Sequence, residues 1–401
     1  MVSGTRVGGC GYRAGHGGGE VVRYNYRLRP GRLAERALLD EWHRCRFLWN
    51  EAVHQQKTGA KPTFGKLSRL LTRARQQSSW LRAGSQVAQQ QTLRTYARAL
   101  DDSFRITGRG RPRCKARKKA LPTLEYTRRG FTLREGRLVL AKGVSVPVVW
   151  SRELPSEPSS VRITRDPLGH WYASFVVTRD AEPVPAAPEG SAIGVDWGVS
   201  RTATTTDERF DLPHRQHRSR CAAELAKAQR TMTRRRRGRG RTPSNGYRRA
   251  RKRAAKIQQK AAARTRHEAR VWARRVVAQH TVIAGEDFRP RFLAKSTMAR
   301  KAADAAITAT KRELVERGRR AGRKVVLVRP AYTSMTCSRC FARAKQPLGL
   351  EQRIFRCPAC GYSGCRDRNA AGVVLAVAER GHTGVDDVRQ ADHLLGGAVA
   401  V

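Results

Sequence analysis

Apolar positions follow a helical period in the first part of the chain. Between Arg32 and Gln56 they recur at spacings of three and four, as in an amphipathic helix. The same spacing from Leu93 to Phe104 predicts a second helix, which ends at a basic loop at residues 108–112. From Leu121 to Val177, short β-rich runs replace this period and predict a small antiparallel barrel or sandwich.

The pattern changes again after residues 180–190, which are rich in proline, alanine and glutamate and predict a linker. Beyond them, strands and helices alternate. The run Ala192–Val195 predicts a buried strand that carries Asp196 at its end, and the threonine-rich run Thr202–Thr206 predicts its hairpin partner. The later elements that the pattern predicts are strands at residues 280–284 and 325–328 and a helix at about residues 297–321.

The segment Arg215–Arg275 predicts a long basic helical hairpin, with its tip at residues 234–245, where glycine, proline and serine interrupt the pattern. It holds 23 Lys or Arg among 61 residues and only two acids. A charge run is usually a solvated surface, yet pairs within a helix cannot balance so many cations with two anions. Nucleic-acid phosphates would neutralise these cations better than the two acids can. We therefore expect nucleic-acid contacts from Arg234, Arg235, Arg236, Arg237, Arg248, Arg249, Arg251, Lys252 and Arg253.

The composition also indicates a polyanionic partner. The 401 residues include 82 Lys or Arg against 32 Asp or Glu, a formal net charge of +50, and nucleic acid is the natural counter-charge. No apolar run of about 18 residues is present to span a membrane. Residues 1–20 are glycine-rich without the apolar core of a secretory signal, so we expect a disordered leader or an over-extended start.

Two cysteine pairs near the C-terminus predict a metal site. Cys337 and Cys340 form one CxxC pair and Cys357 and Cys360 the other, with sixteen residues between the pairs. Four thiolates at this spacing favour a structural zinc ion over a rubredoxin-like iron or an unmetallated redox pair. The remaining cysteines, including the nearby Cys365, are scattered, which suits a reducing cytosol.

Three carboxylates lie where buried elements are predicted to begin or end. Asp196 and Glu286 follow strands, and Asp367 begins a helix seven residues after Cys360. Singly, each acid has an ordinary structural explanation as a turn residue, a solvated strand end or a helix start. Together, inside a strongly basic chain, they favour a cluster that holds two Mg²⁺ ions about 4 Å apart, as phosphodiester hydrolysis requires.

The order of these motifs resembles the TnpB family, the transposon-encoded nucleases also called OrfB transposases, which are compact relatives of type V CRISPR effectors. The resemblance covers about Tyr24 to Gly381. Its most specific segments are Gly194-Val-Asp196-Trp-Gly198, Gly285-Glu286-Asp287-Phe288, Tyr332-Thr-Ser-Met-Thr-Cys337-Ser-Arg-Cys340 and Asp367-Arg-Asn369-Ala-Ala371. Three positions depart from the family pattern without removing a ligand, namely Cys114, Phe341 and Gly285.

This resemblance implies an α/β and β multidomain protein. It implies an N-terminal wedge β-barrel with an inserted helical recognition segment, then a RuvC (RNase H-like) domain split by a zinc ribbon. We therefore expect the following parts: a leader at 1–20, the wedge at 21–190 with its insertion at about 31–106, RuvC at 191–330 with the basic hairpin at 215–275, the target-nucleic-acid-binding ribbon at 331–364, and a RuvC C-terminal helix and tail at 365–401.

The resemblance further implies an RNA-guided DNA endonuclease, with Asp196, Glu286 and Asp367 at the three catalytic positions. A structured RNA from the transposon end would be its guide, and duplex DNA beside a short transposon-adjacent motif its target. The expected location is the bacterial cytoplasm, with the nucleoid, and the choice between monomer and dimer stays open. A guided DNA-binding repressor without cleavage and a strand-transferring transposase are the alternatives. The retained acids favour cleavage, and the ribbon and basic N-terminal lobe favour guided binding.

Overall fold

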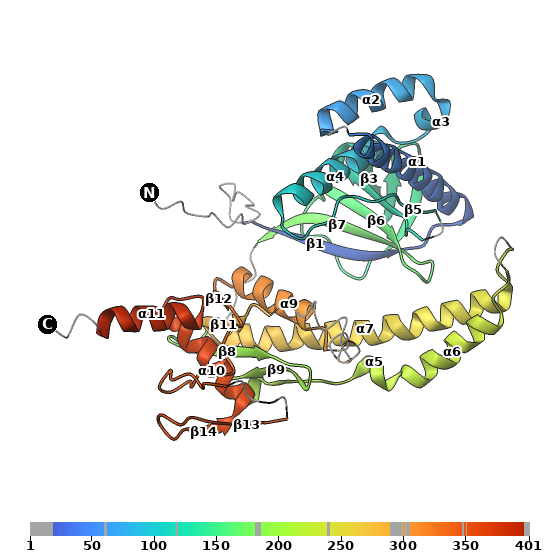
Figure 1. Cartoon of the computed structure of the whole chain (residues 1–401). Helices are drawn as coiled ribbons and strands as arrows, with labels where there is room; N and C mark the ends of the chain where they lie inside the picture. Colours follow the sequence, from blue (N-terminus) through green and yellow to red (C-terminus); the bar gives the residue numbers. More distant parts are fainter. Residues whose placement is uncertain are drawn as a thin grey trace. The chain divides into compact units, whose positions relative to one another are not determined.

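A computed structural model describes residues 19–59, 62–117, 119–180, 186–238, 241–288, 299, 301, 305–346, 349 and 351–396. The chain divides into two compact units, Met1–Glu182 and Pro183–Val401 (Figure 1). Residues 1–18 of the predicted leader and residues 181–185 of the predicted linker lie outside the described part. Within the described residues, no helix is both long enough and apolar enough to cross a membrane.

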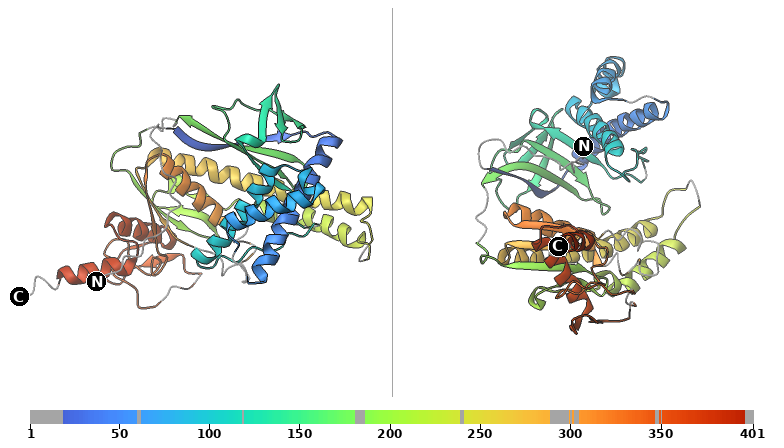
Figure 2. Two further views of the ribbon diagram at one scale, coloured as in Figure 1. Left: turned by 90° about the horizontal axis from the view of Figure 1, so that it is seen from above. Right: turned by 60° about the vertical axis from the view of Figure 1, so that its left-hand side comes forward.

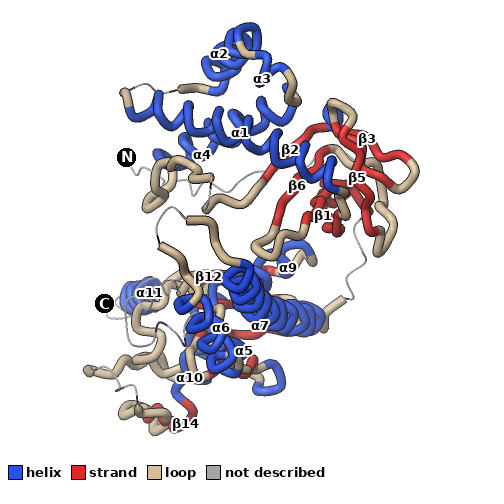
Figure 3. The backbone as a smooth tube through the Cα atoms, turned by 90° about the vertical axis from the view of Figure 1, so that its right-hand side faces the viewer, coloured by secondary structure: helices blue, strands red, loops and turns tan. Residues whose placement is uncertain are grey.

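The first unit is built on an antiparallel sheet of seven strands that curves into a nearly closed barrel (Figure 3). At its centre, β1 (Gly19–Leu28) pairs along its whole length with β7 (Trp171–Asp180). Alternate side chains of β7 face the core, beginning with Trp171, which confirms the predicted antiparallel barrel. The sheet order is β2-β6-β7-β1-β5-β4-β3. The other strands are β2 (Thr123–Thr127), β3 (Phe131–Arg134), β4 (Arg137–Leu140), β5 (Val144–Val149) and β6 (Ser160–Arg165).

Four helices are inserted between β1 and β2. They are α1 (Arg32–Lys57), α2 (Phe64–Gln77), α3 (Ser79–Arg82) and α4 (Gln86–Arg105). The apolar spacing predicted α1 and the later part of α4, which begins earlier than expected because the Ser85 side chain caps its first turn. The analysis did not predict α2, although Phe64, Leu67, Leu71 and Ala74 recur at spacings of three and four and pack into one apolar cluster.

The second unit contains a five-stranded mixed sheet of order β10-β9-β8-β11-β12. As predicted, β8 (Ala192–Trp197) forms an antiparallel hairpin with β9 (Arg201–Thr205). On its other side β8 runs parallel to β11 (Val282–Glu286), which runs parallel to β12 (Lys324–Val328). The edge strand is β10 (Leu212–Pro213). Strand β11 begins two residues later than predicted because His280 caps the preceding helix, and it extends through Glu286.

The predicted basic hairpin is formed by α6 (Ala222–Arg234) and α7 (Asn245–Gln279), which follow the short α5 (His217–Arg220). Small apolar residues join the two helices, among them Ala228, Ala254 and Ile257. Both views in Figure 2 show the hairpin projecting beyond the sheet. The C-terminal part of α7 instead packs on the sheet through Trp272 and Val276.

The described part of this unit also contains the helices α9 (Ile307–Arg320), α10 (Arg366–Glu379) and α11 (Val385–Gly396). The first turns of the helix predicted at about 297–321 fall largely on residues outside the described part. A two-stranded ribbon of β13 (Ile354–Arg356) and β14 (Ser363–Cys365) precedes α10, so α10 follows directly from the cysteine-containing segment.

Candidate active site and metal centre

Asp196 and Glu286 lie at the C-terminal ends of neighbouring parallel strands. The register pairs Val195 of β8 with Gly285 of β11, and one residue further each strand carries its acid. Side chains alternate along a strand. Ile193 therefore contacts the core beneath α7, whereas Gly194 and Asp196 face α10. Asp196 is half-buried and Glu286 is buried, so both carboxylates lie at a partly buried edge of the sheet.

Asp367 is brought to the same edge by an unusually close helix crossing. A Cβ atom added to Gly194 would lie 2.0 Å from the carbonyl oxygen of Ala371, so only glycine allows α10 to cross β8 at this distance. Asp367 lies one turn before Ala371, in the first turn of α10, where the helix dipole favours an acid. Its carboxylate also lies 3.7 Å from Arg366 Nε and 3.8 Å from Arg353 Nη1.

The electrostatics show that the three acids interact. Burial raises the pKa of Asp196 well above its usual range, and the charges of Glu286 and Asp367 raise it further, against the Trp197 backbone N–H and Arg366. Burial raises the pKa of Glu286 to about 7, although Thr333 and Lys311 act in the opposite direction. Like charges gathered in a dry site are costly unless a cation neutralises them. The donor set, carboxylate oxygen only, is the one that Mg²⁺ prefers.

The oxygen atoms of the three carboxylates lie farther from one another than the sulfur atoms of the four cysteines do. Within the described ranges, the four cysteines are the cluster of His, Cys, Asp or Glu whose ligand atoms all lie within 4.8 Å of one another. A site for two cations about 4 Å apart is necessarily wider than a site for one ion, because the ligands surround both.

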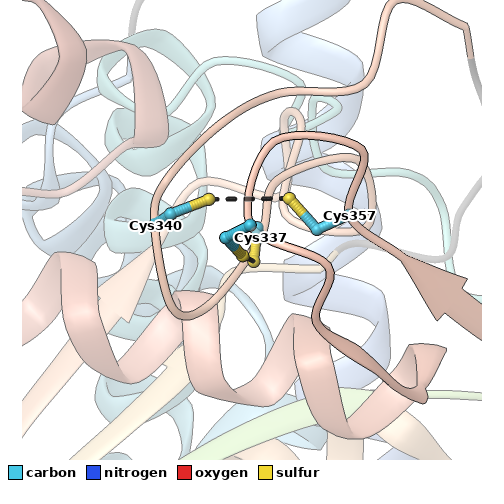
Figure 4. Close-up of side chains that lie close together, drawn as sticks. Cys337, Cys340 and Cys357 are labelled. Atoms are coloured by element: carbon cyan, nitrogen blue, oxygen red, sulfur yellow. Dashed lines mark hydrogen bonds between the residues drawn. The ribbon is translucent and has the colours of Figure 1, made fainter.

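The side chains of Cys337, Cys340 and Cys357 point toward one another (Figure 4). Cys360 completes the cluster, in which the four Sγ atoms lie within 4.8 Å of one another. The Sγ atoms of Cys337 and Cys360 are 3.7 Å apart, and those of Cys340 and Cys357 are 3.5 Å apart. Four sulfurs at about 2.3 Å from a tetrahedral zinc ion would be separated by about 3.8 Å, whereas a disulfide needs about 2.05 Å. The cluster therefore fits a structural zinc ion and not a pair of disulfides.

The cysteine-containing segment, residues 337–360, is called the knuckle below, and several of its thiols have shifted pKa values. Against the effect of burial, hydrogen bonds from the backbone N–H groups of Cys360 and Ala359 lower the pKa of the Cys357 thiol to about 7. Burial raises the pKa of the Cys337 thiol. Against a hydrogen bond from the Ala342 backbone N–H, burial and the neighbouring thiols raise the pKa of Cys340 to about 12. These thiols therefore titrate as a group, and a bound cation would favour their thiolate forms. Cys365 is exposed in β14 and is not a member of the cluster.

Several side chains around the acids were missed by the sequence analysis. The Thr333 hydroxyl donates a hydrogen bond to Glu286 Oε1 at 2.7 Å, and Trp197 Nε1 donates to the Glu286 carbonyl oxygen at 3.0 Å. Lys311 Nζ lies 2.7 Å from Asp287 Oδ1, beside the same strand end. Thr333 is 47 positions from Glu286, and no local pattern in one sequence marks such a pair.

The candidate nucleic-acid contacts form a separate surface on the hairpin. All nine predicted Lys and Arg side chains, from Arg234 to Arg253, are exposed on α6, the tip and the first turns of α7. One of them, Arg253, has an acidic partner, Glu224, at 3.2 Å. At the tip, a hollow of about 400 Å³ is lined by Arg236, Arg237, Gly238, Arg241, Pro243 and Tyr247. The described part of the hairpin thus presents a dense cationic face without a matching set of anions.

Two family models match segments that carry these sites. A model described as a Cas12f1-like TNB domain matches residues 310–374, which include the knuckle and Asp367. An OrfB model described as a probable transposase matches residues 174–296, which include Asp196 and Glu286.

Relatives extend the match over most of the chain. A Streptomyces pristinaespiralis protein named for an RNA-guided DNA endonuclease is 34% identical over 299 residues, which cover 73% of this chain and 71% of the relative. InsQ of Escherichia coli (strain K12), named in the same way, is 26% identical over 378 residues, which cover 88% of this chain and 91% of InsQ. A solved Cas12f1–sgRNA–target DNA complex contains a chain with a similar fold, at a TM-score of 0.53 and 11% identity, covering 90% of this chain and 99% of that one.

The two family models therefore place the chain in the class of OrfB and Cas12f1-like proteins, and the Cas12f1 chain shares its fold. The chain belongs to the TnpB (OrfB) family, as the order of its sequence motifs predicts.

Proposed function

We propose that this protein is an RNA-guided DNA endonuclease encoded by a transposon, which cleaves target DNA next to a short transposon-adjacent motif. Its family membership and the names of its two relatives support guided DNA cleavage. The observation that carries the proposal is the convergence of Asp196, Glu286 and Asp367 at one edge of the mixed sheet. A guide RNA and a duplex DNA target are the proposed partners, and the bacterial nucleoid is the proposed location.

The architecture supports the domain assignments that the family resemblance implies. The mixed sheet with acids at the ends of β8 and β11, followed by α10, supports a RuvC (RNase H-like) domain split by the cysteine-containing segment. The antiparallel barrel with helices inserted after β1 supports a wedge domain with a helical recognition segment. We assign these domains the boundaries expected from the sequence, with one correction: the barrel begins at Gly19 and not at residue 21, because Gly19 and Glu20 already pair with β7 in strand β1.

In the proposed reaction, Asp196, Glu286 and Asp367 would hold two Mg²⁺ ions. The bound ions would supply an activated water and stabilise the oxygen that leaves the phosphodiester. The protein's own contribution is to hold these carboxylates at a partly buried, preorganised edge of the sheet. Trp197 fixes the end of β11 through the Glu286 carbonyl, and Thr333 orients the Glu286 carboxylate. The cationic hairpin would bind nucleic-acid phosphates without reading their sequence.

One experiment tests the proposal directly. The protein would be purified with its bound RNA, the RNA sequenced, and cleavage of matching duplex DNA measured in Mg²⁺. Asp196→Ala should lower the cleavage rate by at least about 1000-fold, because removal of a metal-holding carboxylate removes most of the stabilisation of transition-state charge. The matched control is Asp386→Ala. Asp386 is an exposed acid of α11 that pairs with Arg343, and the protein without it should cut DNA normally.

The alternatives give different results in the same assay. Discrete RNA with guided DNA binding but no cutting by the wild type would indicate a repressor. Joining of DNA strands in place of hydrolysis would indicate a transposase. Normal cutting by Asp196→Ala would contradict the proposed site.

A further inference from the structure

The segment that leads into the cysteine knuckle contacts the candidate catalytic strand directly. Thr333 is buried, with 2% of its surface exposed, and its hydroxyl lies 2.7 Å from Glu286 Oε1. The same hydroxyl lies 3.2 Å from the Pro330 carbonyl oxygen. A hydroxyl has one proton to donate, and the shorter contact to a carboxylate is the stronger of the two. Thr333 thus restricts the orientation of the Glu286 carboxylate.

On the other side of the knuckle, Asn369 binds the backbone around the first cysteine. Asn369 is 1% exposed and lies two residues after Asp367 on α10. Its Nδ2 donates to the Thr336 carbonyl oxygen at 2.7 Å, and its Oδ1 accepts from the Ser338 backbone N–H at 2.9 Å. The residues immediately before and after Cys337 are therefore both held by the helix that carries Asp367.

Close packing reinforces this contact. A Cβ atom added to Gly372 would lie 2.8 Å from Ser338 Cβ, so the knuckle rests directly on the surface of α10. The residue of α10 before Gly372 is Ala371, and its carbonyl oxygen contacts Gly194 of β8. Helix α10 is thus packed directly between the strand of Asp196 and the knuckle.

We propose that Thr333 and Asn369 form a latch that couples zinc binding at the four cysteines to divalent-cation binding at the three carboxylates. Both are positioning residues, and the inference rests on the proposed function. Zinc fixes Cys337 and with it residues 333–338, which contact Glu286 through Thr333 and α10 through Asn369. A loosened knuckle releases the Glu286 carboxylate and the helix start that carries Asp367, so the cation site loses its preorganised shape.

Coupling between two binding sites is reciprocal, which gives the latch a test that does not depend on cleavage. If zinc tightens Mg²⁺ binding, saturating Mg²⁺ must tighten zinc binding by the same factor. Zinc affinity of the full chain would be measured by competition with a zinc-selective chelator, with and without saturating Mg²⁺. We expect Mg²⁺ to tighten zinc binding by about 10-fold in the wild type, as typical couplings between sites do.

Isosteric variants identify the side chains responsible. Thr333→Val keeps the shape and removes the hydroxyl, so it should abolish the effect of Mg²⁺ on zinc affinity and weaken Mn²⁺ binding, used as a spectroscopic probe, by about 10-fold. Thr333→Ser keeps the hydroxyl and should retain both properties. Asn369→Leu removes both hydrogen bonds to the knuckle and should weaken zinc binding itself by about 10-fold or more.

The chain offers a matched control in its other unit. Asn50 makes the same kind of two-bond clamp, donating to the Lys115 carbonyl oxygen and accepting from the Lys115 N–H. Asn50 is half-buried whereas Asn369 is fully buried, so Asn50→Leu should cost less stability, and it should leave zinc affinity, Mn²⁺ affinity and their coupling unchanged.

The outcomes separate the latch from the proposed function. If the wild type binds Mn²⁺ and cuts DNA, but Mg²⁺ leaves its zinc affinity unchanged and Thr333→Val binds Mn²⁺ normally, the latch is wrong and the nuclease stands. If the wild type neither binds Mn²⁺ nor cuts, the proposed function fails and the latch fails with it.

Discussion

At the scale of single residues, the candidate site depends on one glycine as much as on three acids. Gly194 sets the distance between β8 and α10, because any Cβ at this position would meet the Ala371 carbonyl oxygen. The position of Asp367 over the strand ends follows from that distance. A backbone oxygen cannot move aside as a flexible side chain can, so the packing here tolerates little change.

Gly194→Ala should therefore destabilise the second unit and disturb the carboxylates. We expect a loss of about 1–3 kcal/mol in unfolding free energy, the usual cost of overpacking, and a cleavage rate reduced by at least about 10-fold. Thermal unfolding and DNA cleavage would be measured on the same preparation. The control is Gly285→Ala on the neighbouring strand, whose Cβ would make an ordinary contact at 3.8 Å with Leu327. Equal unfolding midpoints for the two variants would contradict this explanation.

The residue scale also shows where sequence analysis stops. Asp196, Glu286 and Asp367 were predicted because each lies at the end of a patterned element, a local signal. Thr333 and Asn369 lie in the same segments, yet their roles depend on partners 47 and 31 to 33 positions away. A threonine before a cysteine and an asparagine in a helix have many ordinary uses. The fold is needed to identify their partners.

At the scale of elements, periodicity predicted most of the helices and strands but not their ends. The hairpin of α6 and α7 was predicted with its tip because a glycine- and proline-containing break interrupts two strongly periodic runs. Helix α2 was missed although its apolar residues Phe64, Leu67, Leu71 and Ala74 recur at spacings of three and four, a pattern as regular as that of α1. The start of β11 was misplaced because the preceding helix ends at a histidine cap that resembles a strand residue.

The hairpin makes its own prediction about salt dependence. Replacing Arg234, Arg235, Arg236 and Arg237 together with glutamine should weaken binding to duplex DNA of any sequence. The slope of log affinity against log salt should become shallower by about 0.9 for each phosphate that the variant no longer neutralises. The four corresponding Arg→Lys substitutions form the control, because they keep the charge and should keep the slope. An unchanged slope in the glutamine variant would show that these exposed side chains do not meet phosphate.

At the scale of the whole molecule, the sequence indicated a barrel-containing part, a linker and an α/β part from changes in composition and period. The structure divides at residues 182–183, within the predicted linker. What no pattern could supply is the packing of α10 against both β8 and the knuckle, because the contact between Gly194 and Ala371 joins positions 177 residues apart. The net charge of +50 agrees with a polynucleotide partner, because the negative phosphates would offset the repulsion among the many Lys and Arg side chains.

The central claim is that three distant acids form one cation site, and localised cleavage of the protein chain tests it most directly. Fe²⁺ bound in place of Mg²⁺ would be treated with ascorbate and peroxide on the zinc-loaded protein, and the cut positions mapped. We predict cuts clustered near residues 196, 286 and 367 together, suppressed by excess Mg²⁺ and absent in Asp196→Ala. Cuts near one acid alone, or cuts that Mg²⁺ does not suppress, would contradict it.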